Sequence, residues 1–296
     1  KTFNVFRFDS ASGAISKVSN ETDWDIKASC AHGNTIVYEA GGRLKQLDTN
    51  TGDVREIVID IDPDLPQLRP QWKSAGDTLQ WAEISPTGKR AIVTARGDVF
   101  TVPVDDGSTR NITRTGSRRE YTGIWSPDGD RVAYIVDSIE GQTLVISDQA
   151  GMGTQQSFEL GPYFYELMQW GGGDDQRIIF SDNHLALYAM RVANGQITTI
   201  ATGARRDDIE AAISPDGAWL AYTVERPNYH RDLQLLNFAN GARIDVTDGM
   251  ADAASPAFSR DGAYLYFAAS TNSGPLQVGL NMTSRERPYR AGLYAA

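Results

Sequence analysis

The sequence predicts an all-β protein built from repeated four-stranded sheets. A short turn motif recurs along the 296 residues, in its clearest form as Ser126-Pro127-Asp128-Gly129. Proline presets φ in such a turn, aspartate bonds to its own backbone, and glycine accepts the positive φ that closes a hairpin. Apolar segments rich in β-branched and aromatic residues flank the turns, as in strands, and a helical period extends over no useful length.

The turn glycines recur at a nearly constant interval. Clear and degenerate copies of the turn end at Gly33, Gly88, Gly129, Gly173, Gly217 and Gly262. The successive spacings are 55, 41, 44, 44 and 45 residues. A period of about 44 residues is typical of a four-stranded propeller blade. The sequence therefore predicts a single β-propeller domain over residues 1–296, with repeats at roughly 1–19, 20–61, 71–114, 115–157, 158–201, 202–247 and 248–296.

Each repeat continues in the same way after its turn. The second strands are expected at 35–38, 91–93, 132–135, 178–180, 220–222 and 264–267. The third strands are expected at 44–47, 99–102, 143–146, 187–190 and 233–236. A glycine turn then leads to a short fourth strand, such as 110–113 or 243–247. The exception in turn chemistry is Gly171-Gly172-Gly173, which replaces the Ser-Pro-Asp turn and predicts a looser blade.

The two ends carry incomplete repeats. Residues 3–8 and 15–18 resemble a third and a fourth strand, whereas 254–258 and 264–268 resemble a first and a second. If these halves pair, about six blades are visible and the ring closes without exposed sheet edges. If residues 291–294 instead add a third strand to the C-terminal half, the N-terminal half is a remnant and the ring is truncated.

Composition excludes several classes of protein. The net charge of −10 leaves no basic surface for nucleic acid, and no apolar run approaches the roughly 20 residues of a membrane span. The single cysteine, Cys30, excludes an internal disulfide and a cysteine-based metal site, and we expect a buried, inert thiol. The chain starts at Lys1 without an initiator Met or a signal peptide, so we expect a fragment or processed piece, with cytoplasmic and periplasmic locations both open.

Motifs for catalysis and metal binding are weak. A Gly-x-Ser-x-Gly elbow is missing, and His32, His184 and His230 are widely separated, so we predict no catalytic residue and no cofactor. Asp60, Asp62 and Asp64 alternate like the first ligands of a calcium loop. The glycine and the bidentate glutamate that such a loop requires are missing, so we predict a solvated acidic loop and no metal.

Charged residues that precede the predicted inner strands form the one constellation that could select a ligand. They are Arg118, Arg119, Glu120, Arg205, Arg206, Asp207 and Asp252. Corresponding positions of a propeller surround one mouth of its channel, where converging charges act on an approaching ligand. The alternative is that these residues are charged only because loop tips are exposed to solvent.

Several longer stretches resemble a known family. Ser-Pro-Asp-Gly before an apolar strand is shared by propellers of the TolB and tricorn types, and further stretches narrow the resemblance to tricorn protease and its bacterial homologues. These stretches are 68–70, 84–91, 95–103, 110–115, 247–250, 255–258 and 264–267. The similarity covers nearly the whole chain.

The resemblance implies a role in proteolysis. Tricorn-like proteins are large hexameric serine proteases that degrade peptides, with two propellers ahead of a catalytic region. This chain resembles the second propeller of the family without its first portion, so seven blades are expected where about six are counted. In the family that propeller is thought to filter and guide peptides and is described as unsealed. The expected partners are peptides, a protease region of the same polypeptide or of a partner protein, and further copies through the full-length protein. The family's catalytic residues belong to the later region, so none is carried over.

A second interpretation has a different function on the same fold. It is a stand-alone propeller of the TolB kind, whose channel mouth binds a partner protein. Fold alone does not decide between the two.

Overall fold

The computed structural model describes residues 2–60, 65–66, 69, 73–203, 209–271 and 290–296. The chain divides into two compact units, residues 1–72 and 73–296. Apart from a single turn of 3₁₀ helix at Gly76–Thr78, every regular element of the described residues is a β-strand. The all-β prediction is confirmed.

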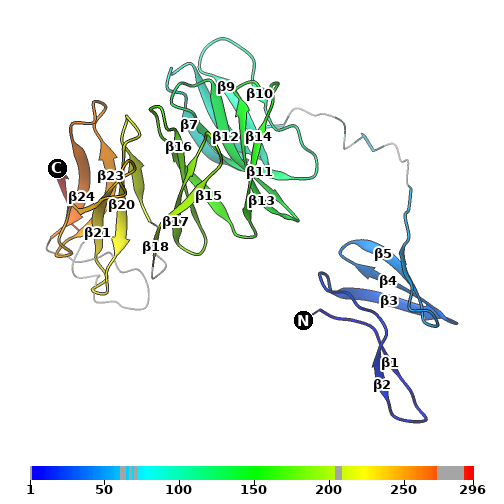
Figure 1. Cartoon of the computed structure of the whole chain (residues 1–296). Helices are drawn as coiled ribbons and strands as arrows, with labels where there is room; N and C mark the ends of the chain where they lie inside the picture. Colours follow the sequence, from blue (N-terminus) through cyan, green and yellow to red (C-terminus); the bar gives the residue numbers. More distant parts are fainter. Residues whose placement is uncertain (1, 61–64, 67–68, 70–72, 204–208, 272–289) are drawn as a thin grey trace. The chain divides into compact units, whose positions relative to one another are not determined.

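The first unit holds a hairpin and one four-stranded sheet (Figure 1). The hairpin pairs β1 (Phe6–Phe8) with β2 (Ile15–Lys17). The sheet has the order β3 (Ile26–His32), β4 (Thr35–Ala40), β5 (Arg43–Asp48) and β6 (Val54–Glu56). Its small core consists of Tyr38, Ala40 and Leu47. Cys30 is exposed, so the prediction of a buried thiol is wrong: β3 is an edge strand whose residues stay accessible along most of its length.

The second unit holds five sheets in chain order (Figure 1). Each strand is antiparallel to its neighbours in the sheet. The first sheet contains β7 (Leu79–Ile84), β8 (Arg90–Ala95), β9 (Asp98–Pro103) and β10 (Arg110–Asn111), and the second contains β11 (Arg119–Trp125), β12 (Arg131–Ser138), β13 (Gly141–Asp148) and β14 (Gln156–Gly161). The third contains β15 (Tyr165–Trp170), β16 (Arg177–Asp182), β17 (Ala186–Arg191) and β18 (Ile197–Thr202), and the fourth contains β19 (Ala211–Ile213), β20 (Trp219–Glu225), β21 (Arg231–Asn237) and β22 (Arg243–Asp245). The fifth contains β23 (Asp252–Phe258), β24 (Leu265–Ser270) and β25 (Gly292–Ala295). The first strands of successive sheets contact one another. This is the arrangement of propeller blades, each of which presents its first strand on the inner side.

The predicted strands are found in order, and the C-terminal sheet has a third strand. β25 joins β24, with Phe267 opposite Tyr294, and makes a three-stranded C-terminal sheet. β1 and β2 pair with each other. The described residues therefore hold five four-stranded sheets, one three-stranded sheet and one two-stranded hairpin, where the sequence showed about six blades. A single propeller domain over residues 1–296 stays a prediction.

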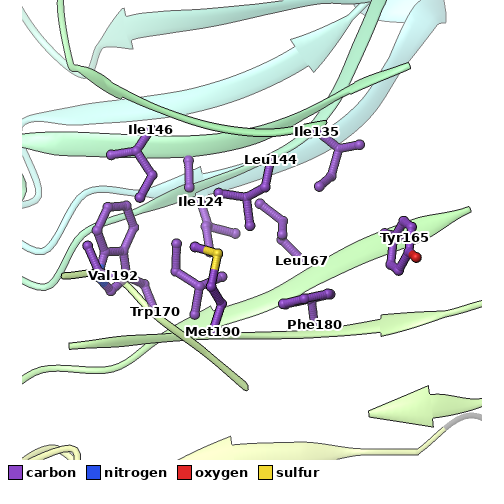
Figure 2. Close-up of a cluster of buried hydrophobic side chains, with 12 residues drawn as sticks. Ile124, Ile135, Leu144, Ile146, Tyr165, Leu167, Trp170, Phe180, Met190 and Val192 are labelled. Atoms are coloured by element: carbon purple, nitrogen blue, oxygen red, sulfur yellow. The ribbon is translucent and has the colours of Figure 1, made fainter. Parts of the chain in front are cut away.

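Apolar side chains from neighbouring sheets form the core of the second unit. The largest cluster lies between the sheets β11–β14 and β15–β18, where Leu144 and Ile124 face Phe180 and Met190 (Figure 2). Further clusters join β15–β18 to β19–β22, and β7–β10 to β11–β14. Because each sheet packs on the next, the stability of one blade depends on its neighbours.

The repeated turn has a common hydrogen-bond pattern. In the second of these sheets, Ser126 Oγ donates to Asp128 at 2.5 Å and accepts from the Arg131 N–H at 2.9 Å. Ser259 and Asp261 make the same contact at 2.6 Å. The Ser126 hydroxyl is the main cause that lowers the pKa of Asp128 below its usual range. The serine and the aspartate therefore hold the turn together.

The glycine run before β16 makes a tight contact, contrary to the expected looser blade. It packs against the Ser214–Gly217 turn of the next sheet. A Cβ at Gly217, where φ is +72°, would lie 2.1 Å from the Gly172 carbonyl oxygen, and a Cβ at Gly173 would lie 2.2 Å from the Asp216 carbonyl oxygen. Only residues without side chains allow these two backbones to approach so closely.

Candidate functional site

A groove of about 700 Å³ crosses the first strands of three successive sheets in the second unit. It is lined by Gln80 and Trp81 of β7, by Arg119, Tyr121 and Thr122 of β11, by Phe164, Tyr165 and Glu166 at the start of β15, and by Ser181, Asp182 and Asn183 at the end of β16. We call it the inner-strand groove. Its volume lies within the range of roughly 300–1,000 Å³ that ligand pockets occupy.

Aromatic side chains give the groove its apolar surface. Phe164 is 61% exposed and Trp81 is 36% exposed, although both are large and apolar. The Arg119 guanidinium lies over the Tyr121 ring, with Cζ 5.1 Å from the ring centroid. Exposed aromatic groups beside a cation are typical of binding surfaces, because they offer apolar area at a low entropic cost.

A buried glutamine fixes the floor of the groove. Gln142 Oε1 accepts from the Tyr165 N–H at 2.8 Å, and it lies 2.6 Å from the Tyr121 hydroxyl. That hydroxyl also lies 2.9 Å from the Tyr165 carbonyl oxygen. Gln142 on β13 thereby joins β11 to β15, and burial raises the pKa of Tyr121 to about 12.

The backbone of β11 is distorted where it lines the groove. Thr122 has φ of +50°, in the left-handed region that β-branched residues avoid. The strand register shifts between Tyr121 and Ile124, as in a β-bulge. Bulges re-aim side chains and interrupt pairing, and they are frequent beside functional sites. The bulge therefore sets the direction of Tyr121 at the groove.

The two acidic side chains in the groove differ in their burial and in their hydrogen bonds to the rest of the protein. Asp182 is buried and accepts from the backbone N–H groups of His184 and Ala186 and from the Tyr188 hydroxyl. Glu166 on β15 is exposed. Asp182 is thus a structural group, whereas Arg119 and Glu166 remain accessible to a ligand.

The predicted charged residues lie in different surroundings. Arg119 lines the groove, and its neighbour Arg118 is exposed outside the lining. Glu120 is buried: Thr115 Oγ1 donates to its Oε1 at 2.5 Å, and its Oε2 has no hydrogen-bond partner among the described residues. Burial is the main cause that raises the pKa of Glu120.

Asp252 belongs to an ion-pair network at the start of β23. Arg231 on β21 donates to both carboxylate oxygens of Asp252, at 3.1 and 3.0 Å, and its Nη1 lies 2.9 Å from Glu210 Oε1. This network connects the last two sheets. Arg205, Arg206 and Asp207 lie outside the described residues, so a charged channel mouth stays a prediction.

The groove residues Trp81 and Tyr121 are not among the site residues expected from the sequence. The run Tyr163-Phe164-Tyr165 lies at the start of β15. The structure divides it: Tyr165 is buried, whereas Phe164 is exposed in the groove. The only signal in the sequence for such a groove residue is an aromatic side chain in an inner strand, and aromatic residues of the core give the same signal.

The described residues contain no group of three or more metal-ligating side chains, and Asp62 and Asp64 lie outside them. Among them, no helix has the length and apolar character needed to cross a bilayer.

Comparison with known proteins gives a consistent result. Residues 79–293 match the model of the tricorn protease second beta propeller domain. The chain is 23% identical over 249 residues to the tricorn protease of Thermoplasma volcanium, covering 82% of this chain and 23% of that protein. It is 21% identical over 297 residues to the putative tricorn-like protease C-terminal subunit of Sulfurisphaera tokodaii, covering 97% of this chain and 33% of that protein.

A solved structure has the same fold. The crystal structure of the tricorn protease aligns with 95% of this chain and 28% of its own, with a TM-score of 0.52 at 18% identity. The chain spans about a quarter to a third of the length of these relatives. The family match covers more than two hundred residues and runs from the start of β7 into β25, the last strand of the second unit. This chain therefore belongs to the family of the second β-propeller domain of tricorn protease.

Proposed function

We propose that this propeller binds peptides in an extended conformation along the inner-strand groove and guides them to a protease region outside these 296 residues. The observation that carries the proposal is the groove itself, which crosses the first strands of three sheets and exposes aromatic side chains. Membership in a propeller family of a protease makes a peptide the fitting ligand. A relative named as a C-terminal subunit supports partnership with other tricorn parts.

Peptide recognition here has a simple physical basis. The main-chain groups of the inner strands are partly taken by neighbouring sheets. The Tyr165 N–H donates to Gln142, and the Tyr165 carbonyl oxygen lies 2.9 Å from the Tyr121 hydroxyl. The Glu120 N–H donates to the Gly97 carbonyl oxygen. A peptide would therefore be held chiefly through its side chains.

Trp81 and Phe164 would contact apolar side chains of the peptide, and Arg119 would attract acidic ones. Contacts that are spread over three sheets select for extended chains over folded ones.

The test is direct binding of fluorescent peptides of graded length, measured by anisotropy, with cleavage followed in the same samples. We expect affinity to rise with length until the groove is filled, and no cleavage. Arg119→Gln should weaken the binding of an acidic peptide several-fold, whereas Arg118→Gln makes the same charge change outside the groove lining and should not. Binding that is unaffected by both Arg119→Gln and Trp81→Ala would refute the groove as the binding site. Binding of a folded partner in preference to every peptide would favour a docking propeller instead.

A further inference from the structure

A second cleft, of about 450 Å³, lies between the sheets β15–β18 and β19–β22. Arg177 at the start of β16, Arg191 at the end of β17 and Arg243 at the start of β22 line it, and we call it the arginine cleft. The inner-strand groove contacts the opposite end of β16, at Ser181 and Asp182. The two sites are therefore separate.

Positive charge in the arginine cleft exceeds negative charge. Of the twelve described residues that line it, three are arginines and none is acidic. Arg177 and Arg191 both contact the single carboxylate of Asp175. Arg243 donates to two neutral oxygens, the Tyr222 hydroxyl at 2.6 Å and the Ile200 carbonyl at 2.8 Å. Within these contacts, two guanidinium groups share one carboxylate and the third contacts no carboxylate, in a chain whose net charge is −10.

A further carboxylate on this sheet, Asp245, contacts another arginine. Asp245 lies two residues after Arg243 on β22, accepts from Gln234 Nε2 at 2.6 Å and lies 3.6 Å from Arg226. Arg226 and Asp245 line a different cleft. Asp245 therefore lies outside the lining of the arginine cleft and pairs with an arginine that is not part of it.

Two of the guanidinium groups are held in place before any ligand arrives. Arg177 is 8% exposed, and its Cζ lies 4.2 Å from the Phe238 ring centroid. Arg191 Nε lies 2.8 Å from Asp175 Oδ1, and 40% of the Arg191 side chain is exposed. The ion pair therefore positions Arg191 while part of its side chain stays open to the cleft. Fixed guanidinium groups bind an anion at a low entropic cost because their planar fork is preorganised.

The remaining wall of the cleft is apolar. Ile200, Leu236 and Phe238 lie on it, beside the hydroxyl groups of Thr198 and Thr199. Guanidinium groups pair with carboxylates through two parallel hydrogen bonds. We propose that the arginine cleft binds a small carboxylate ligand with an apolar body, the carboxylate meeting Arg191 and Arg243 and the body packing on Leu236 and Phe238. This site is independent of the inner-strand groove and adds an anion-binding function on the other end of the same sheet.

Isothermal titration calorimetry of the full chain tests the proposal with three probes. N-acetyl-L-leucine carries a carboxylate and an apolar side chain, N-acetyl-L-leucinamide lacks the charge, and inorganic phosphate lacks the apolar body. We expect N-acetyl-L-leucine to bind at one site, more weakly at higher salt, and the amide not to bind. A charge-assisted hydrogen bond is worth about tenfold in affinity, so Arg243→Gln should weaken binding at least about tenfold, and Arg243→Lys should weaken it less.

Arg260→Gln provides the matched control. It makes the same charge change at an exposed turn of the same unit, outside the cleft lining, and should leave the affinity unchanged. Circular dichroism and thermal unfolding of each variant without ligand separate lost binding from lost folding. Equal binding of the acid and the amide, equal effects of Arg243→Gln and Arg260→Gln, or preferential binding of phosphate would each overturn the proposal.

Discussion

Because two neighbouring turns are in close contact, one added methyl group at Gly217 should lower the free energy of unfolding by an unusually large amount. Gly217 ends a Ser-Pro-Asp-Gly turn with φ of +72°, and a Cβ there would lie 2.1 Å from the Gly172 carbonyl oxygen of the preceding sheet. Gly88 ends a Ser-Pro-Thr-Gly turn with φ of +70°, and a Cβ there would meet no described atom within 4 Å. The pair Gly217→Ala and Gly88→Ala therefore separates backbone strain from contact between sheets.

The two costs can be worked out from these geometries. An L-residue in the left-handed region costs about 1–2 kcal/mol, which applies to both variants. At Gly217 the obstructing atom belongs to the backbone and cannot rotate away, so the two turns must separate. Overpacking of this kind costs about 1–3 kcal/mol more. We expect Gly88→Ala to lower the free energy of unfolding by about 1–2 kcal/mol and Gly217→Ala by about 2–5 kcal/mol.

Urea unfolding of both variants beside the wild type, followed by tryptophan fluorescence, measures the difference. In a unit of this size, 1 kcal/mol corresponds to a change of about 2–4 °C in the midpoint of thermal unfolding, which provides a second readout. Equal destabilisation by the two substitutions would refute the close contact between the sheets. A larger effect of Gly88→Ala would contradict the packing described for the glycine run.

Three further predictions concern buried groups. Glu120→Gln should raise the free energy of unfolding at neutral pH, because burial raises the pKa of Glu120 and the folded state favours its neutral form. In urea unfolding, this gain in stability should vanish as the pH falls below the usual glutamate pKa, and a loss of stability at neutral pH would contradict the prediction. Burial raises the pKa of Tyr121 and of Tyr134 to about 12, so the stability that they contribute is fully present below an unfolded-state pKa of about 10 and is lost as the pH rises through about 12. Ultraviolet absorbance of tyrosinate should then show a late-titrating class, and one transition near pH 10 for every tyrosine would exclude it. Leu144→Ala should lower the free energy of unfolding by about 2–5 kcal/mol, because Leu144 is fully buried in the largest core cluster; a loss below about 1 kcal/mol would show that the cluster collapses around the missing side chain.

The strands were predictable because their signals are local. Proline, aspartate and glycine fix a turn within four residues, and apolar alternation fixes the strand that follows. The turn at Ser126 shows why: its side-chain hydrogen bonds lie within five residues of one another. The order of strands within each sheet then follows from short connections.

The contacts between sheets were not predictable in this way. The glycine run at 171–173 indicated a loose turn when considered alone, because the atoms that fill the space around it belong to the next repeat. The same reason applies to the inner-strand groove, whose residues come from three repeats, and to the arginine cleft, whose arginines come from two. Charge before an inner strand did not distinguish Arg119 in the groove from the buried Glu120 beside it.

Photocrosslinking would locate an extended peptide bound along the inner-strand groove. A peptide that carries a photoreactive residue is bound to the full chain, irradiated, and the modified positions are identified by mass spectrometry. We expect crosslinks at residues 80–81, 119, 121–122 and 164–166, which line the groove, and their loss in the presence of excess unlabelled peptide. Specific crosslinks confined to the outer strands or to the first unit would contradict peptide binding along the groove.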